Sequence, residues 1–143
     1  MPKLPLLFLA TAAACLVVGV CMGLGMGIAH DFHLAPVHGH LNLVGWTSLS
    51  LMGLTYRAYP ELAARRLPAV TQYVLSAGSA MAFPFGIYMA IDHQASGLAI
   101  GAALVWLAGA VLFLARLVLL ALGRGARAGA AAGPARPALA AAE

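Results

Sequence analysis

Residues Leu4 to Ala29 read LPLLFLATAAACLVVGVCMGLGMGIA and contain no charged side chain. About 20 predominantly apolar residues in a helix cross the hydrocarbon core of a bilayer, which is about 30 Å thick. Three further stretches reach that length: His40 to Tyr59, Val70 to Ile91 and Gly97 to Leu122. Because the bilayer interior offers no water to backbone polar groups, each stretch must be helical. The sequence predicts an all-α integral membrane domain over residues 1–123, a four-helix transmembrane bundle.

The composition of the whole chain points to the same class. Of the 143 residues, 63% are hydrophobic and 8% are charged, and the mean hydropathy is +0.94. A soluble domain carries about a quarter charged residues, so the water-soluble globular class is excluded. The net charge of +4 comes from 8 basic and 4 acidic residues, too few for a nucleic-acid surface. We therefore expect the lipid bilayer as a partner and no nucleic acid.

The first apolar stretch has an alternative interpretation as a secretory signal. Lys3 precedes it, and Ala12 to Cys15 resemble a lipoprotein cleavage site. A signal core usually has about 7 to 15 apolar residues, whereas this run continues without charge to Asp31. We interpret it as a retained span. Cys15 and Cys21 form no CxxC pattern, which argues against a disulfide framework and a zinc knuckle, so we expect their thiols to pack in the helix.

The positions of the basic residues predict the orientation. They lie before the first stretch, from the last turn of the second to the start of the third, and from the last two turns of the fourth onward: Lys3, Arg57, Arg65, Arg66, Arg116, Arg124, Arg127 and Arg136. By the positive-inside rule, both termini are cytoplasmic, in a bacterial-type inner membrane. The loops 31–39 and 92–96 then face outward. The tail 124–143 is rich in Ala, Gly, Pro and Arg without a periodic apolar face, and we expect it to be disordered.

Small residues recur at every fourth position in two of the predicted helices. They are Cys15, Gly19, Gly23 and Gly27 in the first, and Gly78, Ala82 and Gly86 in the third. Such stripes let helix backbones approach each other closely, and a flat cofactor edge could use the same surface. Helix packing is the simpler of the two interpretations. Pro84 lies inside the third helix, where it removes a backbone donor and should produce a kink.

All five histidines gather at the outer face. They are His30, His33, His38, His40 and His93, and the acidic residues Asp31 and Asp92 accompany them. Imidazoles are at home at a wet membrane interface, and we interpret His33 and His38 first as interfacial residues. His40 differs because it opens an apolar helix, where an ionisable group is a functional candidate by default.

A metal site is one use of these side chains. A neutral imidazole binds a metal through one ring nitrogen, while a carboxylate or carbonyl usually holds the other. Asp31 and Asp92 are the candidates for that supporting role. His38 and His40 are two positions apart and should point to different sides of their helix, so a site must be assembled between helices.

The second stretch resembles a helix of a known family. HLNLVGWTSLSLMGLTYRAYPE, from His40 to Glu61, looks like the second transmembrane helix of haem-copper oxidase subunit I, with the nitric oxide reductase branch as the nearest match. The shared elements are His40, Asn42, Leu43, Met52, Gly53, Tyr56, Pro60 and Glu61, the later ones shifted by about one residue. The resemblance covers about 22 residues of the 143.

The resemblance implies a haem b site. The opening histidine of that helix is an axial ligand of a low-spin haem b near the outer face, which assigns the role to His40. That subunit has many more helices, and its remaining metal ligands are not encoded here, so a complete oxygen or nitric oxide reductase is not expected. The second ligand would be His93, less favoured His30, or a residue of a second copy across a two-fold axis. Asn42 and Trp46 are further candidates for cofactor contact.

Three functions remain open. The first is a small haem-b protein, acting as a homo-oligomer in electron transfer or in sensing a diatomic gas, with a redox partner or a larger membrane complex. The second is an outward-facing copper or zinc site built from His30, His33, His38, His40 and Asp31, with His93 also a candidate ligand. The third is a noncatalytic membrane subunit. The sequence supplies no acid and base pair or activated nucleophile, so no catalytic residue is predicted.

Overall fold

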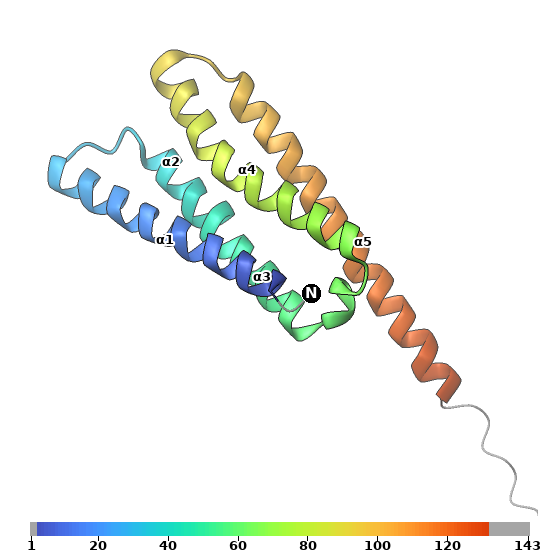
Figure 1. The fold of residues 1–143 in the computed structure, drawn as a ribbon. Helices are drawn as coiled ribbons and strands as arrows, with labels where there is room; N and C mark the ends of the chain where they lie inside the picture. Colours follow the sequence, from blue (N-terminus) through green and yellow to red (C-terminus); the bar gives the residue numbers. More distant parts are fainter. Residues whose placement is uncertain (1–2, 132–143) are drawn as a thin grey trace, which may run out of the picture.

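The computed structural model describes the backbone of residues 3–131 and the side chains of residues 3–124. All regular secondary structure in this part of the chain is helical, and it contains no strand (Figure 1). Its elements are α1 (Leu4–Ala29), α2 (Ala35–His40), the π-helix η1 (Leu41–Ser48), α3 (Leu49–Ala58), the 3₁₀-helix η2 (Pro60–Ala63), α4 (Arg66–His93) and α5 (Gly97–Ala131). The predicted all-α class is confirmed.

Three of these helices, α1, α4 and α5, are long and apolar enough to cross a membrane. The second predicted span is divided among α2, η1 and α3, which follow one another without a break and start five residues before His40. The helix α5 continues to Ala131, so residues 124–131 of the tail are helical rather than disordered, since Ala and Arg favour helix. Residues 132–143 lie outside the described part of the chain.

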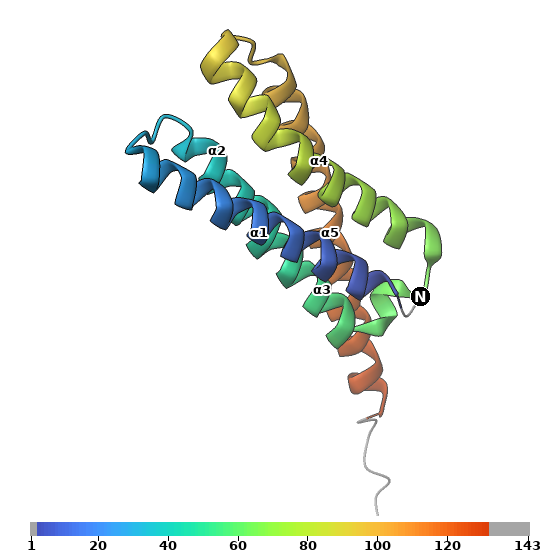
Figure 2. The ribbon, with the colours of Figure 1, turned by 60° about the vertical axis from the view of Figure 1, so that its left-hand side comes forward.

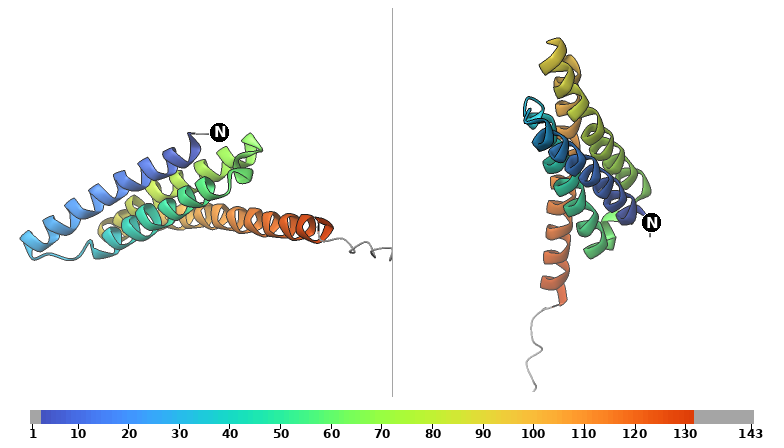
Figure 3. Two further views of the ribbon diagram at one scale, coloured as in Figure 1. Left: turned by 90° about the horizontal axis from the view of Figure 1, so that it is seen from below. Right: turned by 90° about the vertical axis from the view of Figure 1, so that its left-hand side faces the viewer.

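The helices run up, down, up and down. The α1–α2 and α4–α5 connections lie at one end of the molecule, and the start of α1 lies near the α3–α4 connection at the other end (Figure 1). The helix α1 runs beside α3 and η1, while α4 packs along α5 (Figure 2). The last turns of α5 continue beyond the other helices (Figure 3). Short connections between antiparallel neighbours produce this arrangement.

An aromatic cluster fills the core at the end near the start of α1. The Phe8 ring, which is fully buried, stacks on Tyr56 with centroids 5.4 Å apart and meets the edge of Tyr73 at 5.1 Å. The hydroxyls of Thr11 and Tyr73 share a hydrogen bond of 2.8 Å. Such aromatic pairs add about 0.5–1.5 kcal/mol beyond their buried area. The cluster ties α1, α3 and α4 together.

The small-residue stripe of α1 packs against the second helix. A Cβ added at Gly19 would lie 2.6 Å from the amide of Asn42, and one added at Gly23 would lie 3.0 Å from the His38 ring. One turn earlier, Cys15 is buried against Gly45. Side chains of the same molecule therefore cover this part of the stripe. Helix packing is the interpretation that holds there, and a cofactor edge has no place on it.

The first half of α4 carries polar groups that are buried against α5. Gln72, fully buried, donates hydrogen bonds to the hydroxyl of Ser76 at 2.9 Å and to the carbonyl of Gly109 at 3.0 Å. These bonds satisfy the Gln72 amide donor, as a buried polar group requires. Pro84 is buried farther along α4, which continues through it to His93. The hydrogen bonds of Gln72 join α4 to α5. At the other end of α4, Asp92 lies beside the α1–α2 loop.

Candidate functional site

Two helices end with a left-handed residue at the end of the molecule where the histidines lie. His30 terminates α1 with a φ of 51°, and Gln94 follows α4 with a φ of 54°. This conformation is uncommon outside glycine, although histidine and asparagine adopt it more readily than most residues. The backbone N–H of each donates to the main chain of its helix. His30 is therefore an exposed helix cap, which brings the chain round to Asp31.

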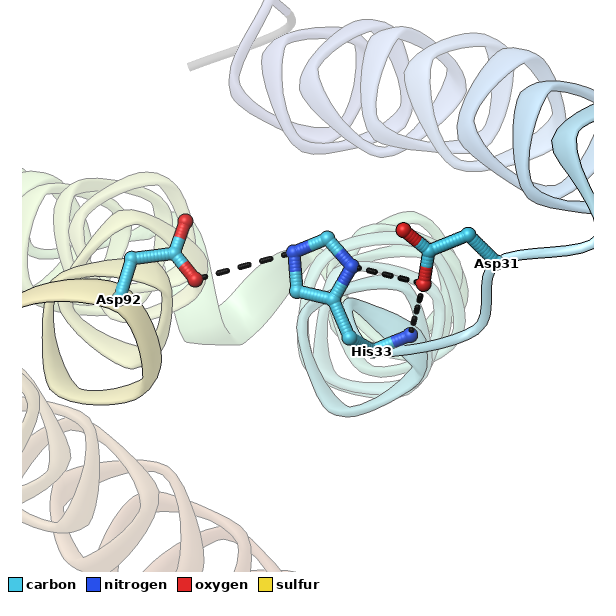
Figure 4. A network of polar contacts seen from close by, with 3 residues as sticks. All are labelled: Asp31, His33 and Asp92. Carbon is cyan, nitrogen blue, oxygen red and sulfur yellow. Dashed lines mark hydrogen bonds and ion pairs between the residues drawn. The ribbon is translucent and has the colours of Figure 1, made fainter.

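His33 lies between two carboxylates from different helical hairpins (Figure 4). Its Nδ1 is 2.9 Å from Oδ1 of Asp31, and its Nε2 is 3.7 Å from Oδ1 of Asp92 at the end of α4. The backbone N–H of His33 also donates to Asp31. That N–H, followed by the ring, holds the pKa of the Asp31 carboxyl below its ordinary value. Asp92 was expected to orient His93, but its contact in the structure is with His33.

His38 faces α1. Its Nδ1 lies 2.9 Å from the carbonyl oxygen of Gly19, and its ring rests on Gly23. A carbonyl oxygen only accepts hydrogen bonds, so Nδ1 carries the proton. The side-chain amide of Asn42 donates to the His38 carbonyl at 3.0 Å and lies 3.4 Å from both ring nitrogens. His38 is thus a half-buried side chain at a helix interface rather than a loop residue in water.

His40 faces α4. Its ring meets Phe83 edge to face with centroids 5.0 Å apart, and its Nδ1 lies 2.8 Å from the carbonyl oxygen of Pro36. By the same argument as for His38, Nδ1 is the protonated nitrogen. In the neutral ring the lone pair is then on Nε2, the arrangement found in most metal-binding histidines. His38 and His40 lie on different sides of their helix, as their spacing predicts.

The π-helix η1 begins directly after His40. Its eight residues, Leu41–Ser48, form a wider turn than an α-helix, and the hydroxyl of Ser48 donates to the carbonyl of Leu43, five residues earlier. Stretches of π-helix are rare and are frequent at functional sites. Trp46 lies in this segment and packs against the main core cluster. The sequence does not predict η1, because the composition of Leu41–Ser48 does not differ from that of an apolar α-helix.

The remaining candidates are spread over the same end. His93 is the exposed last residue of α4, and its ring meets Tyr88 edge to face at 5.9 Å. Asn42 contacts His38 instead of His40, and Trp46 faces the core. A cavity of about 270 Å³ lies beside Asp31 and His33 and does not reach His40. Within residues 3–124, no three His, Cys, Asp or Glu side chains come together as a metal-holding group.

Sequence reasoning also missed a cluster at the opposite end. Arg116 of α5 donates hydrogen bonds to the hydroxyl of Tyr56 and the carbonyl of Leu62, and its guanidinium lies 5.4 Å from the centre of the Tyr56 ring. Arg124 pairs with Glu61 at 2.5 Å. The sequence does place one arginine, Arg116, inside an apolar stretch, and such a residue in a membrane protein needs a polar partner. Its partners lie about 60 residues away in the chain, beyond the reach of local spacing.

Comparison with protein-family models, with curated proteins and with solved structures gives no match for this chain.

Proposed function

We propose that this chain is an integral membrane protein whose four helical runs cross the bilayer, with both termini on the cytoplasmic side. Three helices have the required length and hydropathy, and the continuous run of α2, η1 and α3 supplies a fourth. Only 11% of the most apolar part of α5 is buried within the molecule. Apolar surface on that scale needs a partner, and lipid is the partner that suits a helix exposed along its length.

The distribution of charge supports the orientation. Lys3 precedes α1, Arg57, Arg65 and Arg66 lie around the α3–α4 connection, and Arg116 and Arg124 lie toward the far end of α5. Asp31 and Asp92 lie at the opposite end, beside His33. Basic residues concentrate on the cytoplasmic side of membrane proteins. The histidine-bearing end is accordingly the outward face, in an inner membrane of bacterial type.

We further propose that His40 is an axial ligand of haem b. The observation that carries this proposal is the hydrogen bond from Nδ1 of His40 to the Pro36 carbonyl, because it leaves the Nε2 lone pair for iron. His40 also follows the pattern of the haem-copper oxidase helix that its sequence resembles. When bound, the haem would carry one electron at a time or would bind a diatomic gas. The chain's own residues would hold the imidazole and set its surroundings.

The imidazole of His40 is a suitable ligand for haem iron, but a single copy of the chain offers only part of the surface that a haem needs. His38 has the same protonated Nδ1 as His40, but its ring is enclosed by α1. His40 is not among the residues that line the cavity beside Asp31 and His33, so further groups would have to enclose a haem held by His40. A second copy packed beside His40 would supply such groups, which is why we propose a homo-oligomer. The second ligand is then His93, less favoured His30, or a residue of that copy.

An absorption spectrum tests the proposal. The full chain, made in cells supplied with haem and purified in detergent, should give a reduced-minus-oxidised spectrum with sharp haem b bands. A colourless chain that holds stoichiometric copper or zinc would support the copper or zinc site instead of haem. Among the described residues, no group of three His, Cys, Asp or Glu side chains favours that alternative. A chain that holds neither would be a noncatalytic membrane subunit.

A further inference from the structure

A second site lies at the opposite end from the histidines. A cavity of about 650 Å³ opens between the segment that joins α3 to α4 and the second half of α5. Three arginines line it, Arg65, Arg116 and Arg124, together with a single acidic residue, Glu61. Nothing in the proposed haem chemistry uses this cavity. Its charge and its position across the membrane indicate what it binds.

The carboxylates among the described residues do not balance the charge of the cavity. Glu61 pairs with Arg124, which also lies over the Tyr59 ring at 4.9 Å. Arg116 has only neutral acceptors, the Tyr56 hydroxyl and the Leu62 carbonyl. In the described part of the chain, no carboxylate lies within ion-pair distance of Arg116 or Arg65. A guanidinium has five donors, so Arg116 keeps donors for an anion.

No other acidic side chain in the described residues can supply the missing charge. Asp31 and Asp92 lie beside His33 at the other end of the bundle. A cation close to the hydrocarbon without a counterion is costly, and such residues normally pair with an opposite charge. The described residues therefore leave Arg65 and Arg116 without a counterion, which an anion bound close to them would supply.

The depth of the arginines identifies the region of the bilayer. From Gly97 at the outer end of α5, Arg116 is 19 residues on, which at 1.5 Å per residue is about 28 Å. That distance is close to the thickness of the hydrocarbon core, about 30 Å. Arg124 lies a further 12 Å or so along the same helix. The cavity thus lies where the phosphates of the inner leaflet would be.

The apolar wall of the cavity distinguishes a lipid from a soluble anion. Leu119 and Leu120 of α5 line it beside the arginines, and Leu119 is 69% exposed. An acyl chain can lie along this surface while its phosphate meets the guanidinium groups. Inorganic phosphate would gain nothing from the leucines. Basic pockets at the cytoplasmic ends of membrane helices bind anionic headgroups in this way.

We propose that Arg65, Arg116 and Arg124 form a binding site for the headgroup of an anionic glycerophospholipid of the cytoplasmic leaflet, with Leu119 and Leu120 against its acyl chains. The site rests on the proposed membrane orientation and is independent of haem. Arg116 also holds η2 and α3 in place through Leu62 and Tyr56, so its replacement would disturb the fold. Arg65 is the better test position, because its exposed side chain makes no hydrogen bond with any described residue.

The test is native mass spectrometry of the full chain released from nanodiscs of phosphatidylcholine with a minor fraction of phosphatidylglycerol. We expect one phosphatidylglycerol to remain bound to the wild type. Arg65→Gln should retain it about fivefold less, the effect of one arginine near a membrane surface. Arg66→Gln is the matched control, since Arg66 is adjacent, equally charged and outside the cavity, and it should retain the lipid as the wild type does.

Four results would overturn the proposal. Equal retention of phosphatidylcholine and phosphatidylglycerol would show that the site does not select an anionic headgroup. Equal losses of bound phosphatidylglycerol in Arg65→Gln and Arg66→Gln would show that the lipid responds to the general surface charge and not to this cavity. Loss of the lipid in excess inorganic phosphate would make the site one for the free anion. A chain that does not enter nanodiscs at all would contradict the proposed membrane insertion, and that failure is distinguishable from the other three.

Discussion

Nδ1 of His40 lies 2.8 Å from the carbonyl oxygen of Pro36, four residues earlier in the same helix. This bond fixes the tautomer of the ring and leaves Nε2 as the nitrogen with a free lone pair. His33 is arranged differently, because a carboxylate lies near each of its ring nitrogens. Of these two histidines, which are close in sequence, His40 is the one whose Nε2 has no carboxylate beside it among the described residues. This difference supplies a matched pair for experiment.

His93 and His30 are the two proposed candidates within one chain for the second haem ligand. We expect His93→Ala to retain haem while its spectrum changes from low-spin to high-spin, because one axial ligand is lost. His30 caps α1 in an exposed position, and His30→Ala should leave the spectrum unchanged. Optical and electron paramagnetic resonance spectra of both variants measure the spin state. The reverse pattern would assign the ligand to His30, and two unchanged spectra would assign it to a second copy.

The contact between α1 and the second helix gives a stability prediction. Gly19→Ala places a methyl group against the Asn42 amide, and overpacking of this kind costs about 1–3 kcal/mol. Gly27 lies two turns farther along the same helix with open space around it, so Gly27→Ala should be neutral or stabilise by up to about 1 kcal/mol. Unfolding in mixed micelles with increasing denaturing detergent measures both. Equal effects would mean that α1 does not pack on the second helix through this stripe.

The Asp31 carboxylate gives a prediction for pH dependence. Its pKa is lowered in the folded chain by the His33 backbone N–H and ring. A depressed folded pKa means that its stabilising effect is complete above the unfolded pKa, about 3.9, and is lost as the pH falls through the folded value. The melting temperature of the wild type should therefore exceed that of Asp31→Asn at about pH 5, and the difference should shrink as the pH falls below about 4. A difference that grows as the pH falls below about 4 would contradict the assignment.

The arginines of α5 should contribute unequally to stability. Arg116→Met leaves the Tyr56 hydroxyl and the Leu62 carbonyl without their donor, which costs about 1–3 kcal/mol when such groups are buried. Arg124→Met breaks a pair with Glu61 in which both side chains are about half exposed, and we expect about 0–1 kcal/mol. The same detergent unfolding measurement compares them. A larger loss from Arg124 than from Arg116 would show that the buried contacts carry little weight.

The helices could be predicted from the sequence because each depends on local composition. The first stretch begins and ends where the charge-free run does, so α1 matches its prediction of Leu4 to Ala29. The start of the second helix was placed five residues late, because Pro36 and the histidines in Ala35–His40 resemble a loop in composition. Proline is well tolerated in the first turn of a helix, where its missing N–H has no partner to lose.

The site could be predicted only in part. Topology alone places the histidines at one end, but it does not indicate which ring nitrogen is bonded or to what. The contact of His33 with Asp92 joins residues of two separate hairpins and depends on the register of α4 against the α1–α2 loop. The neighbours of Arg116 depend likewise on the packing of α5 beside η2. Such relationships arise from tertiary packing, about which the spacing of residues in the sequence is silent.

The most direct test of the account is the haem content of His40→Ala measured beside that of His33→Ala. Both variants, made with ample haem, should be folded by circular dichroism and should elute as the wild type does in detergent. The account predicts that haem is absent from His40→Ala, while His33→Ala retains most of it. Equal haem content in the two variants, or a wild type that contains none, would contradict it.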